Sequence, residues 1–227
     1  MCYRRTVTPR EPNEPSSPPC SMHEFAAELL PPPSSEWNEV RAFRKAKRAE
    51  LLERRAALSF HDRQRYAESL TAHLLTAVDF NAYRVLGFYW PIRGELDLRD
   101  FARRQIEAGL TAAIPVVVTK DAPVEFWRWQ PGASLRRGHW NIPVPVERHA
   151  VVPDALLIPL VGYDAAGYRL GYGGGYYDRT IAARHRRPLC IGVGYDDSAL
   201  VTIHPQPHDI PMDVIVTERR VQRFARG

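Results

Sequence analysis

The chain has 227 residues, a length typical of one large domain or of one domain with an extension. Apolar residues make up 44% and charged residues 25%, a globular composition that excludes a wholly disordered or fibrous chain. The net charge is +5, and residues 41–55 hold seven basic against two acidic side chains, so the rest of the chain is nearly neutral. Binding of a large polyanion would depend on this one segment, and a small anionic ligand is at least as good an explanation.

The first 38 residues contain eight of the twenty prolines and no glycine. Such a segment buries too little apolar surface to offset its ordering, so we expect a flexible N-terminal extension with a short helix at 23–30. A single domain is expected to occupy residues 39–227. It begins with a helical pattern, and a second helix is predicted to follow Ser59. In the first helix, the apolar residues that recur at near-helical spacing are Val40, Phe43, Ala46, Leu51 and Leu52. In the second, Leu70, Leu74 and Leu75 are predicted to lie on one face, which would be the buried one.

The remainder of the chain alternates between strand and helix patterns. Strands are predicted at 84–90, 111–118, 124–129, 155–160, 189–195 and 214–217, and helices at 98–108 and 177–186. Short apolar runs separated by helices predict an α/β fold with a mainly parallel sheet flanked by helices. Ligands of such sheets bind in loops at the carboxyl ends of strands, which directs attention to the loop after ALLIPL.

That loop, at 161–179, reads VGYDAAGYRLGYGGGYYDR, and five of the fourteen glycines fall between Gly167 and Gly175. Glycine accepts positive φ and lets backbone N–H groups approach a ligand, and the helix that follows favours anions at its start, so the loop predicts a phosphate site. Arg169 and Asp178 bracket the glycines as an anion contact and a metal ligand would. An ordinary flexible loop is the alternative. The usual nucleotide motifs are absent here, because GxGxxG is interrupted by Tyr176 and no GxxxxGK[ST] is present.

No apolar run approaches the roughly 18 residues of a membrane-spanning helix, and the N-terminus lacks the apolar stretch of a secretory signal. We therefore expect a soluble cytoplasmic protein with no membrane partner. The cysteines, Cys2, Cys20 and Cys190, are odd in number and predict neither a disulfide framework nor a cysteine metal site. Cys190, inside the apolar run LCIGVGY, is predicted to be a buried thiol.

Five ordered motifs resemble those of the 5-formyltetrahydrofolate cyclo-ligases, also called 5,10-methenyltetrahydrofolate synthetases. They are GELDL at 94–98, HWNIPVP at 139–145, IPLVGYDAAGYRLG at 158–171, RLGYGGGYYDR at 169–179 and HDIPMDVIVTE at 208–218. The resemblance covers about residues 40–220, and its glycine motif is distinctive. It implies a fold related to sugar-phosphate isomerases and CoA transferases. The reaction it implies is an ATP- and Mg²⁺-dependent ring closure through an N5 iminium phosphate, with 5-formyltetrahydrofolate as the small-molecule substrate of a monomer.

The resemblance also implies roles for individual residues. ATP contacts are implied for Arg44, Arg48, Arg169, Gly171, Gly173, Gly174, Gly175, Tyr176 and Tyr177. Catalytic roles are implied for Arg169, Tyr176 and Asp178, and Mg²⁺ contacts for Asp178 and Asp209, because hard oxygen ligands suit that ion. The family has a lysine where this chain has Arg44, so the phosphate contact there could pass to Lys45. Folate contacts are implied for Trp90, Glu95, Trp140, Tyr172 and Tyr176.

Each of these roles has a structural alternative. Asp178 could be a helix cap or first-turn acid, Asp209 a turn residue, and the arginines of 41–55 a solvated helix face. Trp140 could pack in the core, as Trp127 and Trp129 are expected to do.

Three other functions compete with the cyclo-ligase hypothesis. One is a nucleic-acid-binding module that uses the helix at 41–55, although Phe43 is the only aromatic residue there and no nucleic-acid partner is expected. The others are a catalytically altered family member and a CoA- or sugar-phosphate-handling enzyme of the same fold.

Overall fold

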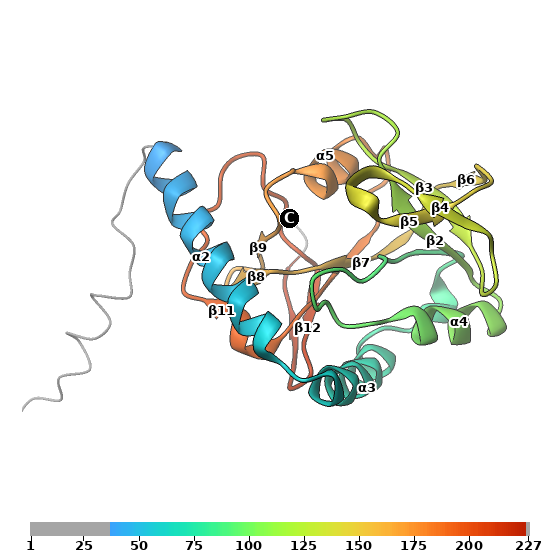
Figure 1. Cartoon of the computed structure of the whole chain (residues 1–227), viewed down its shortest axis with the longest axis horizontal. Helices are drawn as coiled ribbons and strands as arrows, with labels where there is room; N and C mark the ends of the chain where they lie inside the picture. The colour runs from blue at the N-terminus through green and yellow to red at the C-terminus, as the bar shows by residue number, and fades with distance from the viewer. Residues whose placement is uncertain (1–36, 226–227) are drawn as a thin grey trace, which may run out of the picture. The chain divides into compact units, whose positions relative to one another are not determined.

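The structure, a computed structural model, describes residues 37–225. It is a mixed α/β fold around an eight-stranded sheet in the order β13-β12-β10-β7-β1-β2-β3-β6 (Figure 1). The predicted short helix at 23–30 and all but the last two residues of the predicted extension lie outside the described residues. Between residues 37 and 225, no helix combines the length and apolar character needed to cross a membrane.

The helices of this part of the chain are α2 (Trp37–Ala57), α3 (Phe60–Ala77), α4 (Arg99–Glu107) and α5 (Tyr176–Ala182). Short 3-10 turns lie at Phe80–Ala82, His139–Asn141 and Asp196–Ser198. The strands of the large sheet are β1 (Val85–Gly87), β2 (Thr111–Val116), β3 (Glu125–Trp129), β6 (Ala150–Val151), β7 (Ala155–Pro159), β10 (Leu189–Val193), β12 (Val214–Val216) and β13 (Val221–Arg223). Two small sheets contain β4 (Leu135–Arg137) with β5 (Pro143–Pro145), and β8 (Gly162–Asp164) with β9 (Arg169–Leu170) and β11 (Ala199–Leu200).

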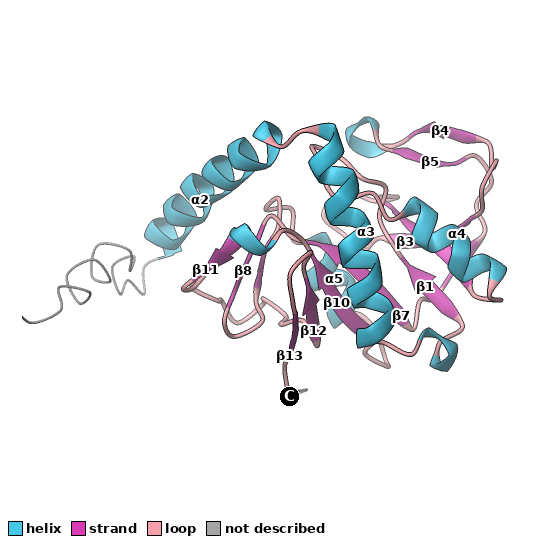
Figure 2. Ribbon diagram, turned by 90° about the horizontal axis from the view of Figure 1, so that it is seen from below, coloured by secondary structure: helices cyan, strands magenta, loops and turns pink. Residues whose placement is uncertain are grey.

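The centre of the large sheet is parallel, as predicted. Strands β12, β10, β7, β1 and β2 pair in parallel, whereas β13, β3 and β6 join the edges in antiparallel pairs. The central strands are apolar along their whole length because both faces of the sheet are covered. Figures 1 and 2 show α3 and α4 on one face and α5 on the other.

Strand β7 shows how two cores are built from one apolar run. Its alternate residues point to opposite faces, as in any strand. Leu157 packs in the cluster that includes residues of α3 and α4, whereas Leu156 and Ile158 pack in the cluster that includes Ile181 of α5. Cys190 lies in this second cluster as a buried free thiol, which confirms the prediction.

All six predicted strands are present, and their ends differ from the prediction by a few residues. The second helix has Ser59 as its N-cap, and the helix predicted at 177–186 begins at Tyr176 and ends at Ala182. Trp127 and Trp129 are buried, as expected. The short strands of the two small sheets were not predicted, because two or three residues carry too little periodicity to be recognised.

The buried face of α2 differs from the predicted apolar one. Its buried residues are Val40, Arg44, Leu51 and Arg55, whereas Ala46 is exposed. In α3 the prediction of Leu75 on the buried face is wrong. Leu70 and Leu74 are fully buried, but Leu75 is 54% exposed because the next helical residue is rotated by about 100° around the axis.

These neighbouring leucines of α3 provide a matched test of the core. Leu74→Ala should lower the free energy of unfolding by about 2–5 kcal/mol, because it removes buried methyl groups and leaves a cavity. Leu75→Ala should change it by less than about 0.5 kcal/mol, because the side chain is largely in solvent. Urea unfolding of both variants measures the difference, and equal losses would contradict the assigned face of α3.

Candidate functional site

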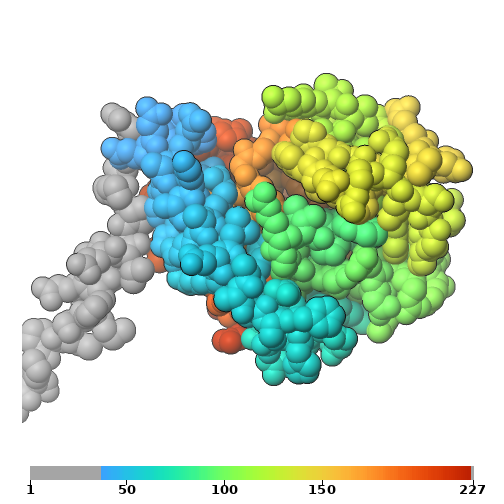
Figure 3. Space-filling view, viewed as in Figure 1, coloured from blue at the N-terminus to red at the C-terminus, as the bar shows by residue number. Residues whose placement is uncertain are grey.

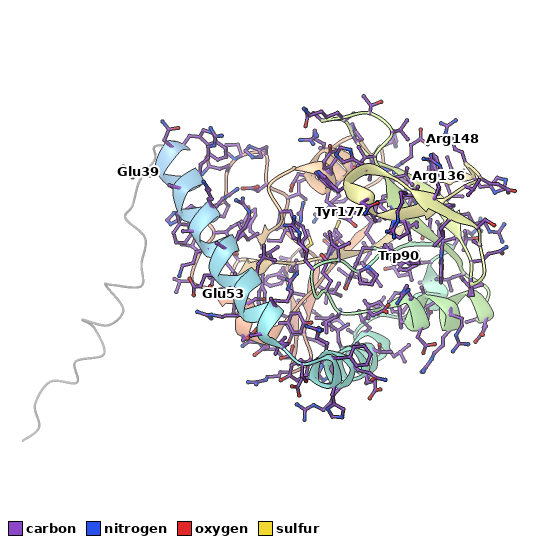
Figure 4. All side chains as sticks on the ribbon, viewed as in Figure 1. Glu39, Glu53, Trp90, Arg136, Arg148 and Tyr177 are labelled. Carbon is purple, nitrogen blue, oxygen red and sulfur yellow. The ribbon has the colours of Figure 1, made fainter. Side chains whose placement is uncertain are left out.

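A cavity of about 980 Å³ lies where the carboxyl end of β7 meets α2, the glycine loop and the start of α5. Figure 3 shows a recess on this side of the molecule, between α2 in blue and the yellow and green segments, with the orange glycine-loop region beneath it. Glu39 and Glu53 lie on the opposite, outer side of α2 (Figure 4). The predicted site residues that line the cavity are Arg44, Arg48, Trp140, Arg169, Gly171, Tyr172, Gly173, Gly174, Gly175, Tyr176, Tyr177, Asp178 and Asp209.

The backbone of the glycine loop explains its composition. Gly173 and Gly175 have φ of 94° and 62°, a region that side chains other than glycine rarely adopt. Gly174 does not share this conformation, but a Cβ there would lie 2.9 Å from the Tyr176 ring. At Gly171 a Cβ would meet no described atom within 4 Å, because this residue borders the open cavity. The loop therefore offers backbone to the cavity, as a phosphate cradle requires.

Helix α2 holds this loop through arginine. The Arg48 guanidinium donates from Nε to the Gly171 carbonyl at 2.7 Å and also lies beside Gly173. Burial, together with the neighbouring Arg44 charge, lowers the pKa of Arg48 below its usual value. The remaining N–H donors of Arg48 lie at the edge of the cavity, where they can contact an anion.

Arg44 is occupied by protein partners instead. Its guanidinium donates to the backbone carbonyls of Ile203 and His204 at 2.9 and 2.8 Å and forms a 2.5 Å ion pair with Asp209. The side chain is buried, so it is not part of a solvated helix face. The adjacent Lys45 is exposed and lines the cavity, which favours the alternative that a phosphate contact falls to the lysine.

Both predicted metal-associated acids are paired with arginines. Asp178 forms a 2.7 Å ion pair with Arg169 and accepts a hydrogen bond from the Ile210 backbone N–H. It lies in the first turn of α5, while Gly175 occupies the N-cap position. Burial would raise the pKa of Asp209, but its hydrogen bonds, chiefly from Arg44, hold that pKa below the ordinary value.

The residues between 37 and 225 contain no group of three or more metal-ligating side chains arranged to hold an ion. Mg²⁺ takes one or two carboxylates together with substrate phosphates and water, so Asp178 and Asp209 fit a metal that arrives with a nucleotide. They do not form a protein cage for a resident ion.

A second cavity, of about 880 Å³, contains Trp90 and Glu95 with residues of α3 and α4. Tyr172, which lines the first cavity, donates a hydrogen bond from its hydroxyl to Glu95 Oε1 at 2.9 Å. This hydrogen bond therefore links a wall residue of one cavity to a wall residue of the other. Both residues were predicted as folate contacts, from motifs far apart in the sequence.

Glu95 is a buried carboxyl group with few compensating partners. Burial raises its pKa to about 7, and this effect outweighs the Ile92 backbone hydrogen bond, the nearby Arg55 charge and the Tyr172 hydroxyl. Arg55, also buried, donates to the Tyr172 hydroxyl at 3.3 Å and to the Leu160 carbonyl. Arg55 was not predicted as a site residue. Its position in the sequence could have indicated that it is buried, because residues 40, 44, 51 and 55 recur on one face of α2.

Tyr177 has a polar group without a protein partner. Its hydroxyl is inaccessible to solvent and has no hydrogen-bond partner among the described residues. The ring lies 6.0 Å from the Arg169 guanidinium and faces the first cavity (Figure 4). A buried hydroxyl is normally hydrogen-bonded, so the Tyr177 hydroxyl is an exception among the described residues.

Trp140 is not a core residue, which excludes its structural alternative. It is 59% exposed, has a φ of 52° and packs edge-on against Tyr176 with ring centroids 5.4 Å apart. The exposed ring therefore borders the glycine loop and offers a flat surface there.

Fold and site together define the class: an α/β enzyme with a small-molecule site at the carboxyl edge of its parallel sheet. The chain belongs to the 5-formyltetrahydrofolate cyclo-ligase family, whose family model matches residues 40–218, so the resemblance predicted from the motifs is confirmed. The 5-formyltetrahydrofolate cyclo-ligase of Escherichia coli strain K12 is 27% identical over 178 residues, which cover 75% of this chain and 98% of that protein.

Solved structures agree with the family assignment and with the predicted fold class. The 5,10-methenyltetrahydrofolate synthetase of Aquifex aeolicus superposes with a TM-score of 0.70 at 31% identity and covers 81% of this chain and 94% of its own. The synthetase of Mycoplasma pneumoniae gives a TM-score of 0.64 at 25% identity, with 77% and 98% covered.

The orphan hydroxyl of Tyr177 can be tested by its effect on stability. Tyr177→Phe should leave the free energy of unfolding unchanged or raise it, because a buried hydroxyl without a partner costs about 1–3 kcal/mol. Tyr89→Phe is the matched control: the Tyr89 hydroxyl donates to the Leu96 carbonyl at 2.8 Å, and its removal should cost about 1 kcal/mol. Denaturant unfolding of both variants decides the point, and a comparable loss at Tyr177 would mean that its hydroxyl is satisfied within the protein.

The pKa of Glu95 predicts how stability depends on pH. Between its ordinary value of 4.5 and about 7, the folded protein holds a proton that the unfolded chain has released. The contribution of this proton to the free energy of unfolding is fully present below pH 4.5. It is lost as the pH rises from 4.5 through 7, which lowers the free energy of unfolding by up to about 3 kcal/mol. Glu95→Gln cannot titrate, so this loss should be absent from the variant.

Urea unfolding of the wild-type protein and Glu95→Gln across this pH range measures the difference. A pH-independent difference in the free energy of unfolding between the two proteins would report only the changed hydrogen bonding of residue 95. Curves that stay parallel from pH 4.5 to above pH 7 would contradict the raised pKa.

Proposed function

We propose that this protein converts 5-formyltetrahydrofolate to 5,10-methenyltetrahydrofolate with consumption of ATP in the presence of Mg²⁺. The observation that carries the proposal is the Tyr172–Glu95 hydrogen bond, which links a wall residue of the first cavity to a wall residue of the second. A reaction between a folate and a nucleotide needs both substrates in contact, and positioning supplies much of such catalysis. The family assignment and the names of the relatives support the same reaction.

The nucleotide side of the proposal uses the first cavity. Backbone N–H groups of residues 171–175 would contact the phosphates, with positive charge from Lys45, Arg48 and Arg169 around them. Tyr176 and Tyr177 would form the wall. Asp178 and Asp209 would share Mg²⁺ with the phosphates. ATP, when bound, supplies the phosphoryl group that activates the formyl oxygen of the folate.

The folate side uses the second cavity and its border with the first. Trp90 and Trp140 would present flat surfaces to the pterin ring from either side of the Glu95–Tyr172 pair. Activation of the formyl oxygen would give an N5 iminium phosphate, on whose carbon N10 closes while its proton leaves. Glu95, with a pKa of about 7, suits the acceptance of that proton at neutral pH. Loss of phosphate would then give the methenyl product.

The structural contacts of α2 argue against a nucleic-acid-binding module. Arg44 and Arg55 are buried, and Arg48 is committed to the glycine loop, so the basic segment is not a free cationic surface. A folate-metabolising monomer of the cytoplasm, acting on small molecules, is the function we propose.

The test measures ADP and the methenyl product together. ADP should appear only when 5-formyltetrahydrofolate is supplied, in one-to-one ratio with the product. Gly171→Val should abolish nucleotide binding without unfolding the protein, because its side chain would enter the cavity and meet no described atom. Binding is measured by calorimetry and folding by thermal unfolding.

Gly174→Val provides the contrast within the same loop. Its Cβ would collide with the Tyr176 ring, so this variant should lose stability as well as binding. Normal ATP affinity in Gly171→Val would refute the cradle. Nucleotide and folate binding without turnover would instead identify a catalytically altered member of the family.

A further inference from the structure

The first cavity extends beyond the glycine loop to a group of residues that no part of the proposed reaction uses. At this end lie Trp37 and Arg41 of α2 with Pro207 and His208. Trp37 precedes the segment 40–218 that the family model matches, so the family assignment gives it no role. It is 42% exposed, an unusual exposure for the largest apolar side chain at a cavity wall.

We propose that Trp37, supported by His208 and Arg41, forms the nucleobase subsite of this cavity, where a purine stacks on the indole. This inference rests on the proposed function, because it assumes a nucleotide with its terminal phosphates in the glycine loop. The chemistry fits a purine. Aromatic and guanidinium surfaces bind the π-face of a base, and such stacking contributes substantially to affinity.

His208 and Arg41 contact the indole of Trp37, and part of its surface remains exposed. His208 meets Trp37 edge-on, with ring centroids 5.8 Å apart and planes at 82°. The Arg41 guanidinium lies 5.9 Å from the centroid of the same ring. Both neighbours fix the ring, yet 42% of the residue remains exposed. An immobilised aromatic surface of this kind can stack on a base with little further loss of side-chain entropy.

The spacing along α2 fits an extended nucleoside triphosphate. Residues 37, 41, 44 and 48 follow one face of the helix, at helical intervals of four, three and four. Trp37 is eleven residues from Arg48, which is about 16 Å along the helix axis. With this span, a base would lie at Trp37 and the terminal phosphates at Arg48 and the glycines. The cationic Arg41 and Lys45 would lie between the base and the terminal phosphates.

Trp140, the other exposed tryptophan of the cavity, does not fit the base in this arrangement. A Cβ at Gly174 would lie 3.4 Å from its ring, so Trp140 borders the phosphate cradle itself. Ribose and the first phosphates must separate a base from the terminal phosphates. The indole at the distant end of the cavity is therefore the nucleobase surface, and Trp140 remains available to the folate.

The test compares ATP with inorganic tripolyphosphate, which has the phosphates but no base. Calorimetric titration of the full chain should show that Trp37→Leu weakens ATP binding about tenfold and leaves tripolyphosphate affinity unchanged. Trp37→Phe, which keeps an aromatic face, should retain most of the ATP affinity. Thermal unfolding of each variant controls for folding, which an exposed residue should scarcely affect.

Each outcome separates this inference from the proposed function. Wild-type protein that binds neither ATP nor tripolyphosphate would refute the nucleotide site and this subsite with it. Equal ATP affinity in the wild type and Trp37→Leu would overturn the subsite and leave the proposed function intact. An equal loss for ATP and tripolyphosphate would also overturn it, because Trp37 would then act through His208 and Asp209 rather than on a base. Should Trp37→Leu unfold, Trp37→Gln, which also lacks an aromatic face, carries the same comparison.

Discussion

The arginines of α2 are the constraint on which the site depends. Arg44, Arg48 and Arg55 project from one face of the helix and reach three separate segments: the 203–209 loop, the glycine loop and the end of β7. Buried guanidinium groups are costly unless their donors are satisfied, and backbone carbonyls satisfy them here. These contacts therefore fix the three segments relative to α2. The same contacts hold α2 against the rest of the domain and define the shape of the cavity.

The same helix also links the walls of the two cavities. Arg55 contacts Tyr172, and Tyr172 contacts Glu95, so a single chain of hydrogen bonds runs from α2 to the GELDL segment. Arg55 and Glu95 are buried and Tyr172 is half-buried, and in such surroundings hydrogen bonds are strong and an unmatched partner is costly. Tyr172 is therefore fixed at the border between the cavities. A flexible glycine loop without this anchor would not keep its tyrosine in one place.

Much of the fold could be predicted from the sequence, because long apolar runs such as ALLIPL dominate their local structure. The site was harder to predict from the sequence. Motifs identified Glu95 and the glycine loop, but no spacing shows that residues 95 and 172 share a hydrogen bond, since that contact depends on tertiary packing. Arg44 illustrates the same limit: a basic helix residue predicts a solvated or ligand-binding side chain, whereas its position beside Asp209 and two carbonyls makes it structural. Trp37 was assigned to the extension because proline-rich sequence precedes it.

The two cavities differ in the balance of basic and acidic side chains along their walls. Six basic residues line this cavity, Arg41, Arg44, Lys45, Arg48, Arg169 and Arg179, against only Asp178 and Asp209. The second cavity is balanced, with Arg63, Arg99, Arg103 and Arg104 opposite Glu68, Glu95, Asp97 and Asp100. A polyanion approaching the molecule is thus drawn to one opening and not to the other, over the roughly 8 Å that physiological ionic strength leaves unscreened. The electric fields at the two openings therefore differ before any recognition of shape begins.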